Sequence, residues 1–239
     1  QQKQAWISEL HQENGEASLP FVGRFTANDA PDVVAQDILR TLEIDPEAYA
    51  ERVPFREWLT KAEAAGIFIS RTSFIHSRLK LDSDEFQGFA IADPHAPFVF
   101  INTEDWDRAQ LFTLVHELAH IWIGASGISS EIDAEPGAVA KSHPTERFCN
   151  QVAAHALMPE RAMERLEASL FSSSGSIAQI AGRFGVSSLA LLIRAHGRGL
   201  VSDATYNGLK STLEKEINDY LRAQAAKTET KPKSKTGPS

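Results

Sequence analysis

The sequence predicts an α+β fold, in which a small, mostly antiparallel sheet is packed with helices and flanked by helical N- and C-terminal extensions. Short apolar and aromatic runs at residues 67–69, 89–92 and 98–101 have the length of buried strands. Longer stretches on both sides repeat apolar residues at helical spacing. The last predicted strand leads into a helical stretch, 111–124, that contains the motif H-E-x-x-H.

Composition narrows the class of protein. With 239 residues, 42% of them hydrophobic, the chain can form one sizeable core with appendages or two small domains. A net charge of −8 argues against a broad nucleic-acid-binding surface. Cys149 is the only cysteine, which excludes a disulfide framework and fits a reducing compartment. No apolar run approaches the ~20 residues of a membrane span. We therefore expect a cytoplasmic protein with no membrane partner.

Residues 1–53 are interpreted as a helical N-terminal extension. An amphipathic helix around Trp6 and Leu10 is expected to end near Gly15. A second helix is expected to begin near Pro31, because proline is favoured in the first turn. No pattern of chemically active residues occurs here, so packing or partner binding is the expected role.

Residues 54–171 are predicted to form the domain that contains the functional site. A helix over 54–65 should lead into the strand at 67–69. The strands at 89–92 and 98–101 are separated by a proline-containing turn, which predicts an antiparallel hairpin or two neighbouring strands. An exposed edge of this sheet beside the motif could bind an extended peptide by strand addition.

The motif consists of His116, Glu117 and His120. On a helix, positions i and i+4 share a face about one turn apart, so both histidines can bind one metal ion. Glu117 can accept a proton from a water on that ion. The alternative is a chance match on an exposed helix. The apolar residues around the motif predict a buried helix instead, where two histidines and a glutamate would not usually lie without a partner.

A third metal ligand is expected on a helix over 144–158. Catalytic zinc usually takes three protein ligands and a water, and two histidines with one glutamate are a known set. Glu146 follows His120 by 26 positions, which is enough for a loop and a return on a second helix. Asn150 shares a face with Glu146 and could hydrogen-bond a ligand histidine. Taken alone, Glu146 could equally be an acidic residue at a helix N-terminus. The loop 124–141 could line the site or be solvated.

These stretches together resemble the ImmA/IrrE family of zinc-dependent metallopeptidases. The resemblance covers roughly residues 55–160. It is carried by GFAIAD (88–93), PFVFINTED (97–105), QLFTLVHELAHIWIG (110–124) and ERFCNQVAAHALMP (146–159). The resemblance implies a minimal, zincin-like metallopeptidase domain with Zn²⁺ as its cofactor.

The resemblance also implies roles for individual residues. His116 and His120 would be zinc ligands, Glu117 the general base, and Glu146 the third ligand, since it lies four positions before the motif asparagine, Asn150. This chain differs from the family at His155, where many members have glutamate. His155 could contact the substrate or the transition state, or be a tolerated surface change. The best-understood members act on transcriptional repressors in stress or mobile-element responses, so the implied substrate is a helix-turn-helix repressor.

Residues 172–224 are predicted to form a helical C-terminal region that resembles a helix-turn-helix. Its two helices are joined at Gly185, with Ser187 as the cap of the second. This second helix is mostly apolar, so packing against the peptidase domain is favoured and direct DNA binding is not expected. A further amphipathic helix is predicted over 206–223. Residues 225–239 are rich in Lys, Pro, Ser and Thr, and we predict a disordered tail.

The functional hypothesis is a zinc-dependent endopeptidase that hydrolyses a peptide bond by Glu117-assisted attack of a zinc-bound water. Two alternatives remain open. One is a DNA-binding regulator that uses residues 176–199, and the other is a protein-interaction module in which zinc is structural or inactive. Catalytic zinc needs an open coordination position, which distinguishes the enzyme from the module. The sequence defines neither the substrate nor the oligomeric state.

Overall fold

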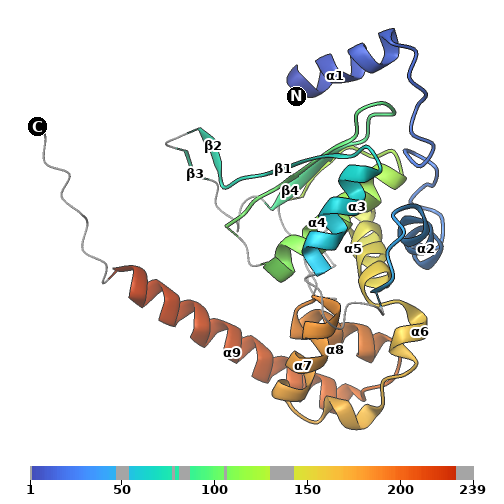
Figure 1. Ribbon diagram of the computed structural model, residues 1–239. Coiled ribbons are helices and arrows are strands. Elements are labelled where there is room, and N and C mark those ends of the chain that lie inside the picture. Colours follow the sequence, from blue (N-terminus) through green and yellow to red (C-terminus); the bar gives the residue numbers. More distant parts are fainter. Residues whose placement is uncertain are drawn as a thin grey trace, which may run out of the picture.

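The computed structural model describes residues 2–46, 54–76, 79–80, 87–104, 107–129 and 143–229. It contains a small mixed sheet with helix α4 (Asp107–Trp122) packed against two of its strands. Helix α5 (Pro144–Leu157) packs in turn on α4 (Figure 1). The predicted α+β class is therefore confirmed. The predicted loop between these helices falls largely on residues 130–142, outside the described residues.

The main sheet has four strands in the order β1-β5-β4-β6. Strand β1 (Phe68–Arg71) runs parallel to β5 (Phe98–Ile101). Strand β4 (Gly88–Ile91) is antiparallel to β5, as the predicted hairpin requires, and to β6 (Gly127–Ser129). A separate antiparallel pair is formed by β2 (Phe74–His76) and β3 (Leu79–Lys80).

Strand β6 corrects the sequence interpretation, which assigned its residues to a loop. Three residues are too few to show the alternation that indicates a strand, and β6 pairs with β4 through its backbone. Strand β6 therefore forms one edge of the sheet.

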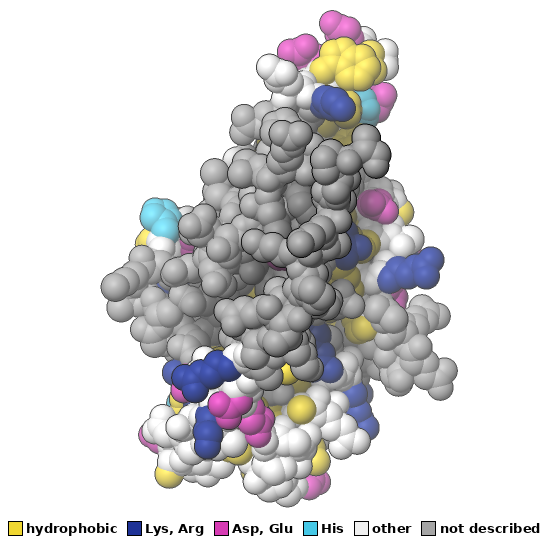
Figure 2. Space-filling view, turned by 90° about the vertical axis from the view of Figure 1, so that its left-hand side faces the viewer, with side chains coloured by type: hydrophobic (Ala, Val, Ile, Leu, Met, Phe, Trp, Pro, Cys, Tyr) yellow, Lys and Arg dark blue, Asp and Glu magenta, His cyan; other side chains and the backbone are white. Residues whose placement is uncertain are grey.

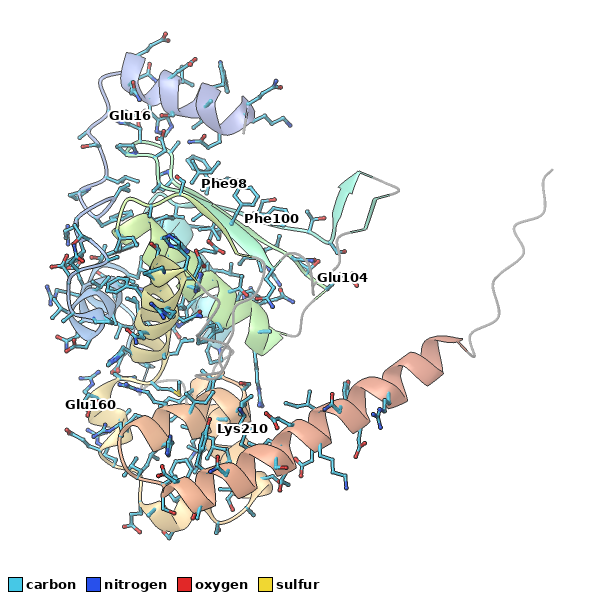
Figure 3. All side chains as sticks on the ribbon, turned by 180° about the vertical axis from the view of Figure 1, so that it is seen from behind. Glu16, Phe98, Phe100, Glu104, Glu160 and Lys210 are labelled. Carbon is cyan, nitrogen blue, oxygen red and sulfur yellow. The ribbon has the colours of Figure 1, made fainter. Side chains whose placement is uncertain are left out.

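The two faces of the sheet differ in their environment. Val99 and Ile101 of β5 are completely buried on the face that carries α4. Phe98 and Phe100 are only half-buried, and Figure 3 shows them on the opposite face. Phe89 of β4 stacks on Phe100 with ring centroids 5.4 Å apart. The strand alternation therefore separates a helix-covered face from an aromatic face.

Helix α2 (Pro31–Thr41) belongs to the same core as the motif helix. It packs against both α5 and α4, and Val34 and Ile38 on it are completely buried. Helix α3 (Pro54–Ala64) adds Trp58 to this core beside α4. The predicted N-terminal extension thus supplies part of the packing around the site. The predicted domain boundaries themselves stay a prediction.

Helix α1 (Gln2–Glu13) lies apart from this core (Figure 1), and its orientation differs from the amphipathic expectation. Trp6 is 62% exposed, and Figure 2 shows hydrophobic side chains at the surface over α1. Ser8 is buried instead, and its hydroxyl donates to Asp93 Oδ1 over 2.8 Å. Polar contacts with the β4–β5 turn therefore attach α1, including Gln4 Nε2 to the Ala96 carbonyl at 2.9 Å.

The C-terminal helices form a group below α4 and α5 in Figure 1. They are α6 (Glu160–Met163), the 3-10 helix η3 (Ala168–Phe171), α7 (Ser174–Phe184), α8 (Ser188–Gly197) and α9 (Asp203–Glu229). The α7–α8 turn contains Gly185, whose φ is +67°. A Cβ there would lie 2.8 Å from Leu111 of α4 and 3.3 Å from Pro54 of α3. The helix-turn-helix-like turn is thus buried in packing against α3 and α4.

Helix α9 is longer than predicted. It continues to Glu229, so residues 225–229 of the predicted disordered tail are helical, and residues 230–239 lie outside the described residues. Gln224, Ala225 and Ala226 are strong helix formers, which explains the extension. Among the described residues, no single helix is both long and apolar enough to cross a membrane. The pair α7 and α8, bent by 94°, meets that test only when the two are combined.

Candidate metal centre

Helix α4 presents the motif histidines toward α5. His116 is 0% exposed and His120 is 1% exposed, and their Nε2 atoms are 3.1 Å apart. This pairing follows from their spacing, since residues four apart lie one above the other on a helix. The burial of α4 on the sheet means that neither imidazole is a surface side chain.

Helix α5 brings Glu146 to the same point. Its Oε2 lies 3.1 Å from His116 Nε2 and its Oε1 lies 3.3 Å from His120 Nε2. Glu146 lies in the first turn of α5, where Pro144 and the cap residue His143 define the start of the helix. The ligand atoms of the two histidines and the glutamate all lie within 4.8 Å of one another.

This spacing fits a tetrahedral metal ion. Zinc bound at about 2.0–2.2 Å from nitrogen and oxygen ligands places those ligand atoms roughly 3.3–3.5 Å apart. The observed separations of 3.1–3.3 Å need only a small outward movement of the donors. Two imidazoles and one carboxylate are also a donor set that zinc accepts. The residues present therefore fit the ion that the sequence predicts.

The second nitrogen of each imidazole has a hydrogen-bond acceptor. Nδ1 of His116 lies 2.8 Å from Oδ1 of Asn150, and Nδ1 of His120 lies 3.2 Å from the Ala125 carbonyl. Both oxygens only accept, so in the neutral rings each Nδ1 carries the proton and donates it. Nε2 of each neutral ring then keeps its lone pair for a metal ion. This is the tautomer that a metal at Nε2 requires.

Electrostatics at the centre favour a cation among these donors. Burial lowers the pKa of His116, so this ring is neutral. Burial would also lower the pKa of His120, but hydrogen bonds with Cys149 and Glu146 raise it to about 11. Burial likewise opposes ionisation of Glu146, yet its contacts with His116 and His120 hold its pKa well below the usual range. One proton among the three donors thus occupies the region that a divalent cation would take.

Glu117 lies on the side of α4 that meets the sheet. Its side chain is 0% exposed, and its charge helps to raise the pKa of the neighbouring His120. A Cβ on Gly88 of β4 would lie 3.0 Å from Glu117 Oε1 and 2.8 Å from Thr113 Cγ2. The strand can therefore approach the carboxylate closely because position 88 has no side chain.

His155 lies away from the three donors. It follows Glu146 by nine residues, which is two and a half helical turns and places it on the opposite side of α5. Its ring contacts the guanidinium of Arg194 on α8, with Nδ1 3.0 Å from Nη2. Burial and the charge of Arg194 lower the pKa of His155. The structure thus brings His155 to the C-terminal helices and does not bring it to the candidate site.

Two arginines at the C-terminal end of α8 form ion pairs with Glu160, close to His155. Arg194 Nη2 lies 3.2 Å from Glu160 Oε2, and Arg198 Nη2 lies 2.7 Å from Glu160 Oε1. Figure 3 shows Glu160 at the junction between α5 and the C-terminal helices. These ion pairs join the C-terminal end of α8 to the start of α6.

Three contributors to the site were not predicted. Cys149 hydrogen-bonds His120, and burial raises the pKa of its thiol, so it is a neutral neighbour. Its position three residues after Glu146, on the same helical face, was an available signal. The Ala125 carbonyl orients His120, and Gly88 leaves space for the Glu117 carboxylate. Neither Ala125 nor Gly88 has a chemically distinctive side chain. Sequence reasoning therefore had no signal for these two.

Comparison with known proteins yields one family. The model of the Peptidase_M78 family, described as the IrrE N-terminal-like domain, matches residues 62–196, which is more than half of the chain. The matched region includes all three donors and runs through most of α8. It agrees with the resemblance to the ImmA/IrrE family seen in the sequence motifs. A search of curated proteins found no match.

Proposed function

The chain belongs to the Peptidase_M78 family of IrrE N-terminal-like domains, and from this premise we propose that it is a zinc-dependent endopeptidase. Membership supports a function of the metallopeptidase type. The observation that carries the finer proposal is the convergence of His116, His120 and Glu146 within 4.8 Å, with Glu117 next to the first of them. We assign the three converging residues as metal ligands and Glu117 as the general base.

The donor set favours catalytic over structural zinc. Structural sites usually have four protein ligands, and catalytic sites have three with a position left for water or substrate. Among the described residues, the donor group that includes the motif has three members. Nitrogen and oxygen donors without thiolate are also typical of catalytic hydrolytic zinc. We therefore propose that the fourth position is available for chemistry.

When bound, zinc would acidify a water molecule and polarise the peptide carbonyl. The side chains and backbone groups of the protein transfer the proton and orient the metal ligands. Glu117 accepts the proton of the attacking water and delivers it to the leaving amine. Asn150 and the Ala125 carbonyl keep His116 and His120 in the tautomer that leaves Nε2 free to bind. The buried position of Glu117 keeps its carboxylate close to the reaction and apart from bulk water.

We propose that the substrate is an extended segment of a helix-turn-helix repressor in the cytoplasm, as the family resemblance implies. The fold supports an extended peptide in particular. Strand β4, which carries Gly88 beside Glu117, is followed across the sheet by the edge strand β6. A peptide added to this edge would extend the sheet that carries Gly88, at about two strand spacings (~10 Å) from β4.

The test combines metal analysis with cleavage of candidate repressors, followed by mass spectrometry of the fragments. Wild-type protein should contain one zinc per chain and cut a defined bond. Glu117→Gln should retain the zinc and lose cleavage by about a thousandfold or more, because the general base is removed. His116→Ala should lose the zinc. Full cleavage by Glu117→Gln would refute the assigned base, and a zinc-free wild type would refute the metal site.

A further inference from the structure

A segment outside the matched family region contacts the C-terminal end of the motif helix. Residues 19–25 lie across the last turn of α4. The Gly23 amide donates to the Ile121 carbonyl over 3.0 Å, and the Phe25 amide donates to the Trp122 carbonyl over 3.0 Å. The last carbonyls of a helix have no partner within it. The Ile121 carbonyl also accepts from the Gly124 amide over 3.1 Å, and the Phe25 amide satisfies the Trp122 carbonyl.

Trp122, the last residue of α4, is held from two sides. Its indole is 0% exposed and stacks on Phe21 with ring centroids 4.5 Å apart. Its Nε1 donates to Asp37 Oδ2 on α2 over 3.0 Å. The ring therefore cannot rotate without breaking either a buried hydrogen bond or the stack.

Asp37 is a buried carboxylate at the centre of this arrangement. It is 6% exposed, and besides Trp122 it accepts two hydrogen bonds from Arg24 Nη1, at 3.0 Å to Oδ1 and 2.8 Å to Oδ2. Arg40 lies 3.6 Å from Oδ1. Arg24 also donates from Nε to the Pro20 carbonyl over 3.1 Å. Asp37 thus joins α2, the segment 19–25 and the end of α4.

The arrangement extends to His120. Gly124 follows α4 with a φ of +66°, and a Cβ on it would lie 3.1 Å from the Gly23 Cα. The two backbones are therefore in direct contact. The next residue, Ala125, bonds His120 twice: its amide donates to the His120 carbonyl over 3.0 Å, and its carbonyl lies 3.2 Å from His120 Nδ1. The contact of Gly23 on Gly124 consequently supports the carbonyl that orients the imidazole.

We propose that Asp37 is a positioning residue of the metal centre: through Trp122 and the contact of Gly23 with Gly124, it keeps the Ala125 carbonyl where it orients His120 as a ligand. This inference rests on the proposed zinc site. Residues 19–37, which show no pattern of chemically active residues in the sequence, would then support the metal site. The hydrogen bond between Asn150 and His116 is separate from this linkage.

The test measures zinc affinity by competition with a chromogenic chelator. Asp37→Ala should weaken zinc binding by about 10- to 100-fold, the loss typical when a residue that orients a metal ligand is replaced. Asp37→Asn keeps an acceptor for the Trp122 indole and should lose less. Trp122→Phe, which removes the indole N–H and keeps an aromatic ring for Phe21, should weaken binding by roughly three- to tenfold. This milder variant keeps the test decisive if Asp37→Ala does not fold.

Asp93→Asn is the matched control. Asp93 is also a partly buried aspartate that accepts several hydrogen bonds, from Ser8 and from the His95 and Ala96 amides, but it lies in the β4–β5 turn. Its variant should alter thermal stability and leave zinc affinity within twofold of wild type. Folded Asp37 and Trp122 variants with wild-type zinc affinity would overturn the positioning role.

Amide hydrogen exchange in metal-free protein separates this inference from the proposed function. Asp37→Ala should accelerate exchange at the Gly23, Phe25 and Ala125 amides and leave the Val186 amide of the C-terminal helices unchanged. Wild-type protein that binds no zinc would refute the proposed function, and the exchange data would still decide the linkage from Asp37 to Ala125. Unchanged exchange at Ala125 would overturn that linkage even if zinc binds.

Discussion

Nδ1 of His116 lies 2.8 Å from Oδ1 of Asn150, one turn along α5 from Glu146. Glu146, a proposed metal ligand, and Asn150, which hydrogen-bonds a second proposed ligand, therefore come from one face of one helix. The position of α5 therefore affects the metal centre in two ways. A shift of this helix would move Glu146, and it would also break the hydrogen bond that orients the His116 ring.

Replacement of Asn150 tests that relationship. Asn150→Ala removes the acceptor for His116 Nδ1–H, so the ring can rotate or change tautomer, and zinc affinity should fall by about 10- to 100-fold. Asn150→Asp restores an acceptor and should bind zinc at least ten times more tightly than the alanine variant. Chelator competition measures both. Equal affinities for the alanine variant and wild type would show that Asn150 does not orient the ligand.

Gly88→Ala tests the close approach of β4 to Glu117. The added Cβ would lie 2.8 Å from the Phe100 carbonyl oxygen and 3.0 Å from Glu117 Oε1, so strand or carboxylate must move. We expect a loss of about 1–3 kcal/mol in the free energy of unfolding. We also expect kcat to fall about tenfold to a hundredfold with zinc retained, because a general base displaced by a fraction of an ångström works poorly.

Gly197→Ala is the control for that substitution, since a Cβ there meets nothing within 4 Å and its φ is not left-handed. It should leave both stability and turnover close to wild type. If Gly88→Ala keeps wild-type kcat while losing stability, the glycine serves packing and not the position of Glu117.

The contact between His155 and Arg194 predicts a pH dependence of stability. Burial, together with the charge of Arg194, lowers the pKa of His155 in the folded protein below its ordinary value of 6.5. The unfolded chain therefore binds a proton more readily as the pH falls through about 6.5, and acidification destabilises the fold. His155→Gln cannot titrate, so its melting temperature should fall less than that of wild type between about pH 7.5 and 5.5.

The matched control for this prediction is Gln151→Ala, an exposed position without a titrating group on the same helix, which leaves the contact with Arg194 intact. It should show the wild-type pH dependence of the melting temperature. A steeper loss of stability at low pH for His155→Gln than for wild type would contradict the assigned sign.

Sequence periodicity was sufficient for the parts of the site that depend on helical faces. The i, i+4 spacing of His116 and His120, and of Glu146 and Asn150, brings side chains together whenever two helices pack, and the structure brings all four together. Periodicity also accounts for the position of His155, once its nine-residue distance from Glu146 is converted to an angle.

The remaining features depend on backbone groups or on long-range packing. The Ala125 carbonyl and the Gly23 amide are chemically the same as every other carbonyl and amide, so no residue pattern marks them. Strand β6 is too short to show alternation. Helix α1 has apolar residues at helical spacing, but hydrogen bonds of Ser8 and Gln4 with the β4–β5 turn orient it with Trp6 exposed. These contacts form only after distant segments have packed.

Metal removal should change stability in a pH-dependent manner. In the metal-free protein, His120 carries a proton because its contacts with Cys149 and Glu146 raise its pKa to about 11 against the effect of burial. Zinc must displace that proton, so its affinity should rise about tenfold for each pH unit between about pH 7 and 9, and fall on acidification. A ligand present at a hundred times its Kd stabilises the fold by about 2.7 kcal/mol. Chelation should therefore lower the melting temperature by several degrees, and by more at pH 8 than at pH 7 when free zinc is held constant.

His120→Ala removes both the ligand and the titrating group, so its melting temperature should not respond to the chelator at either pH. An affinity independent of pH would show that zinc does not compete with the proton on His120.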